Sequence, residues 1–473
     1  MSKQQKAQSK YANLEPIFNP KSVAIIGASE KPGKVGHAIM QNYADVGFEG
    51  NIYPINVEST GTIMGHTAYR SVADVRKPID MAVISIPSQS VPKVMEECGR
   101  AGVKGAVVVS SGFAEIGQIR LQDRIVSISK KYGMTMVGPN CLGVMDIRAR
   151  NDTMFLPTFK IDRPKIGGVS FVSQSGSVGS TTLDMISSSG FGLSRFISYG
   201  NAAAVDEVDI LHYLAHDVHT QVIVLYLEGV KRGREFIEVA KEVTRLKPVV
   251  AIKAGSTPMG AGAAHSHTAS LAGHYAAYDA VFRQYGFVTA EDTEDLLYFA
   301  KTFDTQPLTT GNRVAVITNG GGHGVLAADA IYKSGMSLPP LSPRTAASLR
   351  KVMPPTVNVR MPLDIGGDAD SRRFSDALEI VSRDPSVDAL MVITLFQTPG
   401  ADDKVAESVI DYAVRREKPL VVVSTGGTYT KSHTTVMESS GVPIYDSTAK
   451  AAKSLAALIG YSRYRERCAQ KEK

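Results

Sequence analysis

Short apolar segments that end in glycine and lead into helical patterns recur along the whole chain, and this repetition constrains the fold more than any other feature. In the first third these segments are SVAIIG (22–27), NIYPIN (51–56), DMAVISIP (80–87) and GAVVVSSG (105–112). Strands that alternate with helices predict βαβ units, and almost continuously apolar strands predict parallel sheets that are buried on both faces.

An apolar strand, a Gly/Ser turn and a helix also open each third of the chain, at 22–36, 168–179 and 313–324. The 473 residues suit three domains at roughly 150 residues each. We therefore expect an α/β protein with three domains, over residues 1–147, 148–303 and 304–473. The polar, proline-containing segment 148–164 is interpreted as the first linker, and 302–312 as the second break.

Composition and charge exclude several classes of protein. With 43% hydrophobic and 21% charged residues the chain matches globular averages, which argues against a disordered, collagen-like or disulfide-scaffold protein. The three cysteines, Cys98, Cys141 and Cys468, form no CxxC pair, so neither a disulfide framework nor a zinc site of cysteines is indicated. The net charge of +6 suits a small anionic ligand and does not by itself indicate nucleic acid.

The N-terminus, MSKQQKAQSKYANLEP, is polar and lacks the apolar core of a signal peptide. No apolar run approaches the roughly 20 residues that a membrane-spanning helix needs. We therefore expect a cytoplasmic protein without contacts to a membrane.

The first turn, VAIIGASEKPGKVG (23–36), has the composition of an anion-binding turn. Glycine lets the backbone approach a ligand closely, and the free amides at the start of a helix favour negative charge. The spacing departs from the dinucleotide pattern GxGxxG, because Ser29 stands where the second glycine belongs. The second strand ends in Asn56, followed by Glu58, so NAD is disfavoured but stays open, as does a turn without any ligand.

Segment 254–275, AGSTPMGAGAAHSHTASLAGHY, follows a strand and therefore leaves from the carboxyl edge of a parallel sheet, where open α/β folds bind ligands. It carries His265 and His267 among small residues. Three interpretations are open for these side chains. They could ligate a metal together with His274, although the segment contains no carboxylate or cysteine. They could be solvated, or one imidazole could accept a phosphoryl group and pass it on.

SHTASLAG (266–273) resembles SHTGSLAG, the motif of the alpha subunits of NDP-forming acyl-CoA synthetases (acetate–CoA ligase, ADP-forming), which are relatives of succinyl-CoA synthetase. The resemblance covers nearly the whole chain. It implies a Rossmann-like CoA-binding domain followed by two flavodoxin-like domains of the succinyl-CoA synthetase type. It also places the family's phosphorylated histidine at His267, with Ala269 where the family usually has glycine.

Other motifs extend the resemblance along the chain. The first turn, YPIN (53–56) and GPNCLG (138–143) match the CoA-binding domain, and FVSQSGSVG (171–179) matches the glycine-rich turn that receives the phosphohistidine. YLEG (226–229) matches the site of the glutamate that orients the histidine, here Glu228. In the third domain VITNGGGHGVLAADA (316–330) and MPLDIGGDA (361–369) also match, with His323 in place of a usual proline. The implied CoA-binding residues are Gly27, Ser29, Gly33, Lys34, Val35, Asn56, Pro87 and Asn140, and the implied phosphate-binding residues are Ser173, Gln174, Ser175, Gly176 and Ser177.

The family implies the reaction acyl-CoA + phosphate + ADP ⇌ carboxylate + ATP + CoA, through an acyl phosphate and a phosphohistidine. Neither an ATP-grasp module nor a P-loop GxxxxGK[ST] is found in the sequence. We therefore expect ADP or ATP and Mg on a separate ATP-grasp beta subunit of a hetero-oligomer, and CoA and phosphate on this chain, which would hold no metal itself.

Two other functions stay open from the sequence. The first is a non-catalytic CoA-binding or regulatory protein of the same fold, and the second, weaker one is an NAD-dependent dehydrogenase built on the first domain. The residues fix neither the acyl group nor the direction of the reaction nor the number of subunits.

Overall fold

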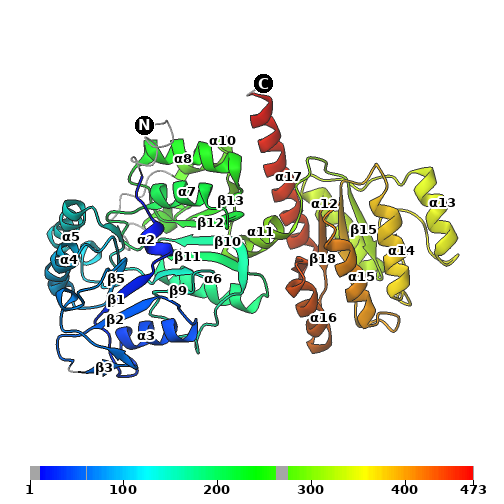
Figure 1. Cartoon of the computed structure of the whole chain (residues 1–473). Coiled ribbons are helices and arrows are strands. Elements are labelled where there is room, and N and C mark those ends of the chain that lie inside the picture. The colour runs from blue at the N-terminus through cyan, green and yellow to red at the C-terminus, as the bar shows by residue number, and fades with distance from the viewer. Residues whose placement is uncertain (1–10, 60, 263–274, 472–473) are drawn as a thin grey trace. The chain divides into compact units, whose positions relative to one another are not determined.

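The computed structural model describes residues 11–59, 61–262 and 275–471. The chain divides into two compact units, one made of 1–188 and 192–287 and the other of 189–191 and 288–473. Among the described residues, the first unit contains two large sheets and the small antiparallel pair β3-β4, and the second unit contains one large sheet (Figure 1). The predicted α/β class is confirmed, and each of the three large sheets is wholly or mainly parallel.

The first sheet has the strand order β2-β1-β5-β6-β7, and all its pairs are parallel. Its strands are apolar throughout because helices cover both faces. Helices α4 and α5 lie side by side over it (Figure 1). Its elements are α2 (Glu15–Phe18), β1 (Ser22–Ile26), α3 (Val35–Asp45), β2 (Asn51–Ile55), β3 (Thr62–Ile63), β4 (His66–Thr67), η1 (Val72–Asp74), β5 (Met81–Ile84), η2 (Ser88–Ser90), α4 (Val91–Arg100), β6 (Gly105–Val108), η3 (Ala114–Ile116), α5 (Ile119–Tyr132) and β7 (Thr135–Val137).

The second sheet of this unit has the order β13-β12-β10-β11-β8-β9. Strands β10 to β13 pair in parallel, and the short strands β8 and β9 extend the edge in antiparallel pairing. Its elements are β8 (Gly143–Asp146), β9 (Asn151–Asp152), β10 (Ile166–Ser173), α6 (Gly176–Ser188), β11 (Leu193–Ser198), α7 (Glu207–His216), β12 (Val222–Leu227), α8 (Gly233–Leu246), β13 (Val249–Lys253) and α10 (Tyr275–Gln284).

The interpretation of 148–164 as a linker is wrong. Strand β9 lies inside this segment and pairs with β8, and residues 151–154 are buried. Arg163 Nε donates to Asp152 Oδ2 at 2.7 Å, and Asn42 Nδ2 donates to the Met154 carbonyl at 2.7 Å. These hydrogen bonds and the burial of 151–154 make this part of the segment an integral part of the folded unit.

The second unit has one parallel sheet in the order β16-β15-β17-β18-β19. The break expected at 302–312 begins later, because helix α11 continues to Thr305. The elements of this unit are β14 (Val288–Thr289), α11 (Thr293–Thr305), β15 (Val314–Thr318), α12 (Gly321–Lys333), α13 (Pro343–Val352), β16 (Leu363–Asp364), α14 (Ser371–Ser382), β17 (Ala389–Ile393), α15 (Asp403–Ala413), β18 (Leu420–Val423), α16 (Thr428–Ser439), β19 (Ile444–Tyr445) and α17 (Thr448–Gln470).

All three sheets share a topological switch point. In each sheet the first parallel strand (β1, β10 or β15) has the second parallel strand on one side and the third on the other. The connections that follow the first and third strands therefore leave in opposite directions and open a crevice at the carboxyl ends, where α/β folds bind ligands. The three turns singled out in the sequence follow these three first strands.

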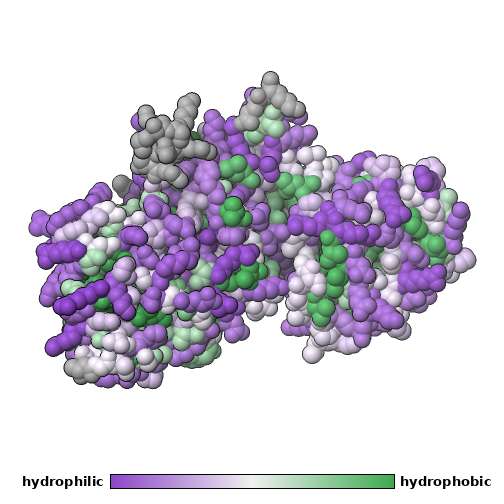
Figure 2. Space-filling model, viewed as in Figure 1, coloured by the Kyte–Doolittle hydropathy of each residue, from purple (hydrophilic) through white to green (hydrophobic). Residues whose placement is uncertain are grey.

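Buried and exposed side chains agree with this architecture. The strands carry the core, while the surface in view is largely hydrophilic with scattered apolar residues (Figure 2). Cys98 and Cys141 are buried, and burial raises the pKa of each thiol to about 12, so both act as small packing groups. Among the described residues, no helix is both long and apolar enough to cross a bilayer.

Candidate functional site

The turn after β1 requires glycine at two positions. Gly27 has a φ of +92°, and a Cβ there would lie 2.6 Å from the Ser85 carbonyl oxygen. A Cβ at Gly36 would lie 1.9 Å from the carbonyl oxygen of Gly27. Helix α3 therefore starts in direct contact with the turn, which only the lack of side chains allows.

The start of α3 is open toward solvent. Lys34 is the N-cap residue, and no side chain among the described residues caps the helix. Gly33 has a φ of +84° with open space around it, and Lys34 and Val35 are exposed. Uncapped helix amides next to a lysine favour an anionic group, so this end of α3 can receive one.

The side chains of Ser29 and Asn56 form hydrogen bonds with the backbone at this turn. The Ser29 hydroxyl accepts a hydrogen bond from the Lys31 amide at 3.1 Å. Asn56 Nδ2 donates to the Ala28 carbonyl at 2.9 Å, and its Oδ1 accepts from the Glu58 amide at 2.9 Å. Both side chains thus fix the conformation of the backbone that a ligand would meet.

The structure brings most of the predicted CoA-binding residues to three adjacent strands. Asn56 follows β2, the glycine turn follows β1, and Pro87 follows β5. Asn140 follows β7 at the far edge of the sheet, with a φ of 58°. Its Nδ2 donates to Asn201 Oδ1 at 3.2 Å, which ties it to the second sheet instead of to the glycine turn.

Gln174 holds together the turns after β10 and β12. Its Oε1 accepts from the amides of Glu228 and Gly229, the latter at 3.0 Å, and its Nε2 donates to the Gly229 carbonyl at 2.9 Å. Because β10 and β12 flank the switch point of the second sheet, this amide joins two of the predicted functional segments at the crevice.

Three serines crowd the start of α6. The buried Ser173 hydroxyl donates to the Ser175 carbonyl at 2.8 Å, and the hydroxyls of Ser175 and Ser177 lie 3.2 Å apart. The Ser175 hydroxyl also lies 3.4 Å from the Val178 amide, at the long end of hydrogen-bond distances. With Gly176 as the first helical residue, the amides of this helix start meet hydroxyl groups that can turn toward an anion.

Glu228 is buried beside a lysine that the sequence analysis missed. Glu228 is 8% exposed and Lys253 is 5% exposed. Burial lowers the pKa of Lys253, and the nearby Glu228 carboxylate opposes this shift. The Lys253 ammonium also lies 4.8 Å from the centre of the Tyr278 ring, whose hydroxyl accepts from the Val230 amide at 3.0 Å. Strand register explains the pairing, since Lys253 at the end of β13 lies opposite Leu227.

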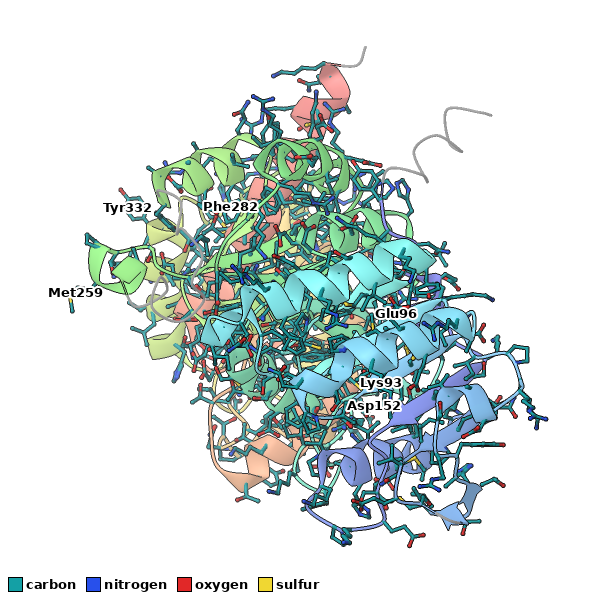
Figure 3. All side chains as sticks on the ribbon, turned by 90° about the vertical axis from the view of Figure 1, so that its left-hand side faces the viewer. Lys93, Glu96, Asp152, Met259, Phe282 and Tyr332 are labelled. Atoms are coloured by element: carbon teal, nitrogen blue, oxygen red, sulfur yellow. The ribbon has the colours of Figure 1, made fainter. Side chains whose placement is uncertain are left out.

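His265, His267 and His274 lie outside the described residues, so the role of His267 stays a prediction. The segment that carries them begins next to Glu228, because the Ala254 amide donates to the Leu227 carbonyl at 2.8 Å. Just before the undescribed part, Met259 is 88% exposed and points outward (Figure 3).

The corresponding turn of the third sheet is built on Asn319. Its Nδ2 donates to the Leu395 carbonyl at 3.1 Å, and its Oδ1 accepts from the Leu395 amide at 2.9 Å. The side chain joins the turns after β15 and β17, as Gln174 joins those after β10 and β12. Helix α12 follows with Gly320 as its N-cap residue and His323 in its first turn.

Family models match each of the three sheet regions. A "CoA binding domain" matches 21–146, a "Succinyl-CoA ligase like flavodoxin domain" matches 166–303, and a "Ligase-CoA domain" matches 314–471. The acetate–CoA ligase [ADP-forming] I subunit alpha of Pyrococcus furiosus is 39% identical over 467 residues, which cover 97% of this chain and 100% of that one. The chain belongs to this family of ADP-forming acyl-CoA synthetase alpha subunits.

Two further similarities support the family. The acetate–CoA ligase [ADP-forming] of Methanocaldococcus jannaschii is 42% identical over 453 residues, which are 95% of this chain but only 63% of that protein. A solved structure of the dinucleotide forming acetyl-coenzyme A synthetase 1 of Ca. Korarchaeum cryptofilum, in complex with phosphate and ADP, matches with a TM-score of 0.91 and 36% identity, covering 97% of this chain and 99% of that one. The predicted order of a CoA-binding domain and two succinyl-CoA ligase-like domains is thereby confirmed.

Proposed function

We propose that this alpha subunit catalyses the acyl and phosphoryl transfers of an ADP-forming acyl-CoA synthetase: acyl-CoA + phosphate + ADP ⇌ carboxylate + ATP + CoA. The observation that carries the proposal is the junction at the second switch point. There Gln174 binds the turn of Glu228, and the segment of His267 starts beside Glu228. Glu228, the start of α6 and Ala254, from which the chain leads on to His267, thus lie at the carboxyl ends of neighbouring strands.

The reaction divides into steps that these residues can support. An oxygen of phosphate attacks the thioester carbonyl, the C–S bond breaks, and an acyl phosphate and CoA thiolate form. A ring nitrogen of His267 then attacks phosphorus, and the P–O bond to the acyl group breaks to release the carboxylate. Glu228 would accept the other ring N–H, which keeps the attacking nitrogen free. ADP finally attacks the phosphohistidine, and the P–N bond breaks to give ATP.

The α6 helix start supports the charge of the transferred group. The phosphoryl oxygens would meet the amides of Ser175, Gly176 and Ser177 together with the hydroxyls of Ser175 and Ser177. Phosphoryl transfer depends mainly on positioning and on stabilising negative charge, and the amides of a helix start supply both without a bulky cation. Lys253 would balance the Glu228 carboxylate, so the site need not bury an uncompensated charge.

CoA would bind at the turn after β1. Gly27 and Gly33 let the diphosphate approach the backbone, the start of α3 and Lys34 supply positive potential, and Asn56 keeps the turn in shape. Glu58 stands where the family has a lysine, so Lys34 carries more of the charge compensation here.

The nucleotide would bind elsewhere. The matching Pyrococcus furiosus relative is named as an alpha subunit, and we infer from this a separate ATP-grasp beta subunit that holds ADP or ATP with Mg. The two chains would form a hetero-oligomer. The acyl group is to be found by assaying several acyl-CoAs with this complex.

Labelling with phosphate tests the proposal. The chain, incubated with a candidate ATP-grasp partner and ³²P-labelled ATP, is expected to gain one acid-labile, base-stable phosphate. His267→Gln should abolish the label, and the matched variant His265→Gln, two residues away on the same segment, should keep it. Equal labelling of both variants, or no label on the unmodified chain with an active partner, would refute the proposal.

A further inference from the structure

Helices α7 and α8 bring together three side chains that the proposed reaction does not use. His212 and His216 stand one turn apart on α7, and Glu242 faces them from α8. His216 Nε2 lies 2.8 Å from Glu242 Oε1, and His212 Nδ1 lies 3.5 Å from Glu242 Oε2. One ligand atom of each residue lies within 4.8 Å of the others.

This donor set is the one that zinc and similar divalent ions prefer. Imidazole nitrogens and carboxylate oxygens bind zinc at about 2.0–2.2 Å, and two histidines at positions i and i+4 of a helix present their rings on one face. Two ligands of one tetrahedral ion lie roughly 3–4 Å apart, so the observed separations need only small side-chain rotations. The side chains of His216 and Glu242 are free to make these rotations, because they are 57% and 38% exposed.

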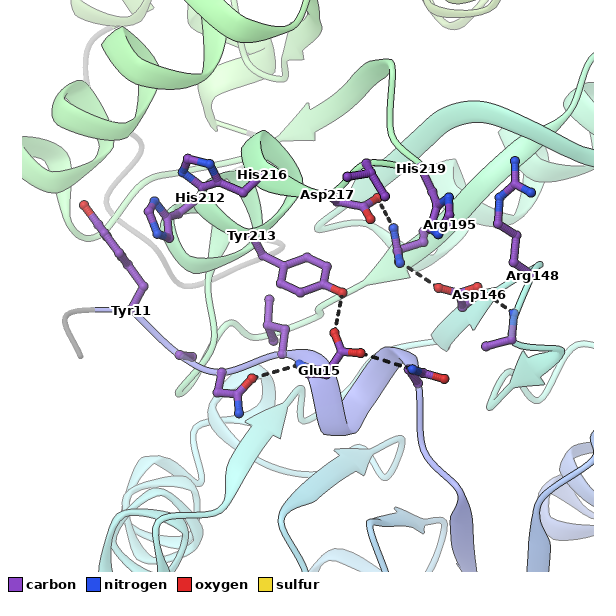
Figure 4. A pocket seen from close by; sticks show the side chains of 16 residues that line it. Tyr11, Glu15, Asp146, Arg148, Arg195, His212, Tyr213, His216, Asp217 and His219 are labelled. Atoms are coloured by element: carbon purple, nitrogen blue, oxygen red, sulfur yellow. Dashed lines mark hydrogen bonds and ion pairs between the residues drawn. The ribbon is translucent and has the colours of Figure 1, made fainter. Parts of the chain in front are cut away.

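The ring of His212 is held in a fixed orientation by a neighbouring aromatic side chain. Tyr11 stacks on its ring with the centroids 3.9 Å apart, and both rings face each other in Figure 4. The buried Nδ1 of His212 faces Glu242 Oε2 at 3.5 Å, longer than an ordinary hydrogen bond. The stacking on Tyr11 thus orients the ring with this nitrogen toward the carboxylate, and an ion between the two groups could bind both.

A cavity adjoins the two histidines of this cluster. It has a volume of about 910 Å³, and its lining includes Tyr11, His212, His216 and His219 (Figure 4). It leaves room for a water or another small ligand beside an ion held by three protein atoms. Zinc sites with three protein ligands keep a fourth position for a water or another small ligand, whereas structural zinc sites are closed by four protein ligands.

We propose that His212, His216 and Glu242 form a binding site for one zinc ion or a similar divalent transition-metal ion, with its open coordination position at this cavity. The site lies outside the predicted CoA and phosphate turns and is independent of the proposed reaction. Because it joins α7 to α8, the ion stabilises the packing of this helix pair in the folded state.

Titration calorimetry with zinc chloride tests the site on the tag-free, full-length chain. We expect one equivalent to bind, and the thermal unfolding midpoint to rise with zinc concentration. His216→Gln and Glu242→Gln should each weaken binding by about tenfold or more. Both side chains are partly exposed, so the variants should keep their fold, and their unfolding midpoints without zinc provide the check. Cobalt(II) should give visible absorption bands that both variants lose.

Two matched variants locate the ion. His219→Gln removes a histidine of the same cavity, and His267→Gln removes one from the separate histidine segment; both should bind zinc as the unmodified chain does. The proposal is overturned if zinc does not bind saturably, if binding survives His216→Gln and Glu242→Gln unchanged, or if His267→Gln abolishes it.

Discussion

The turns after β1 and β10 occupy the same position in two sheets of the same unit, yet they are built in opposite ways. The β1 turn gets its shape from glycines and places its charge, Lys34, in solvent. The β10 turn gets its shape from the Gln174 side chain and lies next to the buried pair Glu228 and Lys253. Strand order thus fixes where each site lies, and the side chains around it decide what the site can do.

The difference between the turns after β1 and β10 suits two different kinds of ligand. An exposed glycine turn admits a large anion that binds and leaves, and solvent moderates each charge contact. In a buried turn the low dielectric strengthens every charge contact, so a carboxylate there can orient an imidazole firmly. We therefore expect substitutions in the β1 turn to act mainly on binding, and those in the β10 turn mainly on the rate of phosphoryl transfer.

The largest effect is expected for Glu228→Gln. The amide keeps the shape but loses the charge that would accept the histidine N–H, so phosphohistidine formation should fall by about 10³-fold or more. CoA affinity should stay the same, because Glu228 follows β12 in the second sheet, whereas the predicted CoA turn follows β1 in the first. The labelling rate and a CoA titration measure the two effects.

Glu238→Gln, on the exposed face of α8, is the matched control and should change the labelling rate by about twofold at most. If the labelling rate of Glu228→Gln fell by less than tenfold, or if its affinity for CoA fell as much as its labelling rate, the proposed separation of CoA binding from phosphoryl transfer would be wrong.

Gly36→Ala should have the next largest effect and should act on stability. Its Cβ would lie 1.9 Å from the Gly27 carbonyl oxygen, so the backbone of the turn or helix α3 must shift. We expect a loss of about 3 kcal/mol in the free energy of unfolding, measured with urea. Gly33→Ala is the control: nothing lies within 4 Å of its Cβ, and only the positive φ costs about 1 kcal/mol. Equal losses in the two variants would contradict the packing of α3 on the turn.

The sequence predicted the strands and turns well because their pattern is local. The apolar segment 22–27 becomes β1 and Gly27, and 105–112 begins with β6. Lys253 was missed because its pairing with Glu228 depends on the register of β12 with β13, which no local pattern shows. The candidate metal site was missed for the same reason, since Glu242 reaches the histidines only through the packing of α8 on α7.

Buried charge near the second switch point also predicts a pH dependence. Burial and the neighbouring Asp206 raise the pKa of Glu207 to about 8, although Lys231 and Arg232 oppose the shift. The folded chain therefore keeps a proton that the unfolded chain releases near pH 4.5. The stabilisation from this group is complete below that pH and is lost as the pH rises toward 8.

Glu207→Gln removes this titration and nearly keeps the shape of the side chain. Between pH 5.5 and pH 8 the stability of the variant should fall by about 3 kcal/mol less than that of the unmodified chain. Unfolding midpoints at the two pH values give the comparison. Parallel pH profiles for the two proteins would mean that Glu207 is ionised in the folded state.

The smallest effect is expected in the exposed β1 turn, for Lys34→Gln. This change removes one positive charge beside the open start of α3, and the KM for CoA should rise by about tenfold with an unchanged turnover rate. Lys93→Gln removes a lysine that is also exposed, on α4 (Figure 3), and should leave the KM within about twofold. Added salt should reduce the difference in the KM for CoA between Lys34→Gln and the unmodified chain, because mobile ions screen an exposed charge. If the turnover rate of Lys34→Gln fell while its KM stayed constant, the β1 turn would take part in phosphoryl transfer, and the contrast between the two turns would fail.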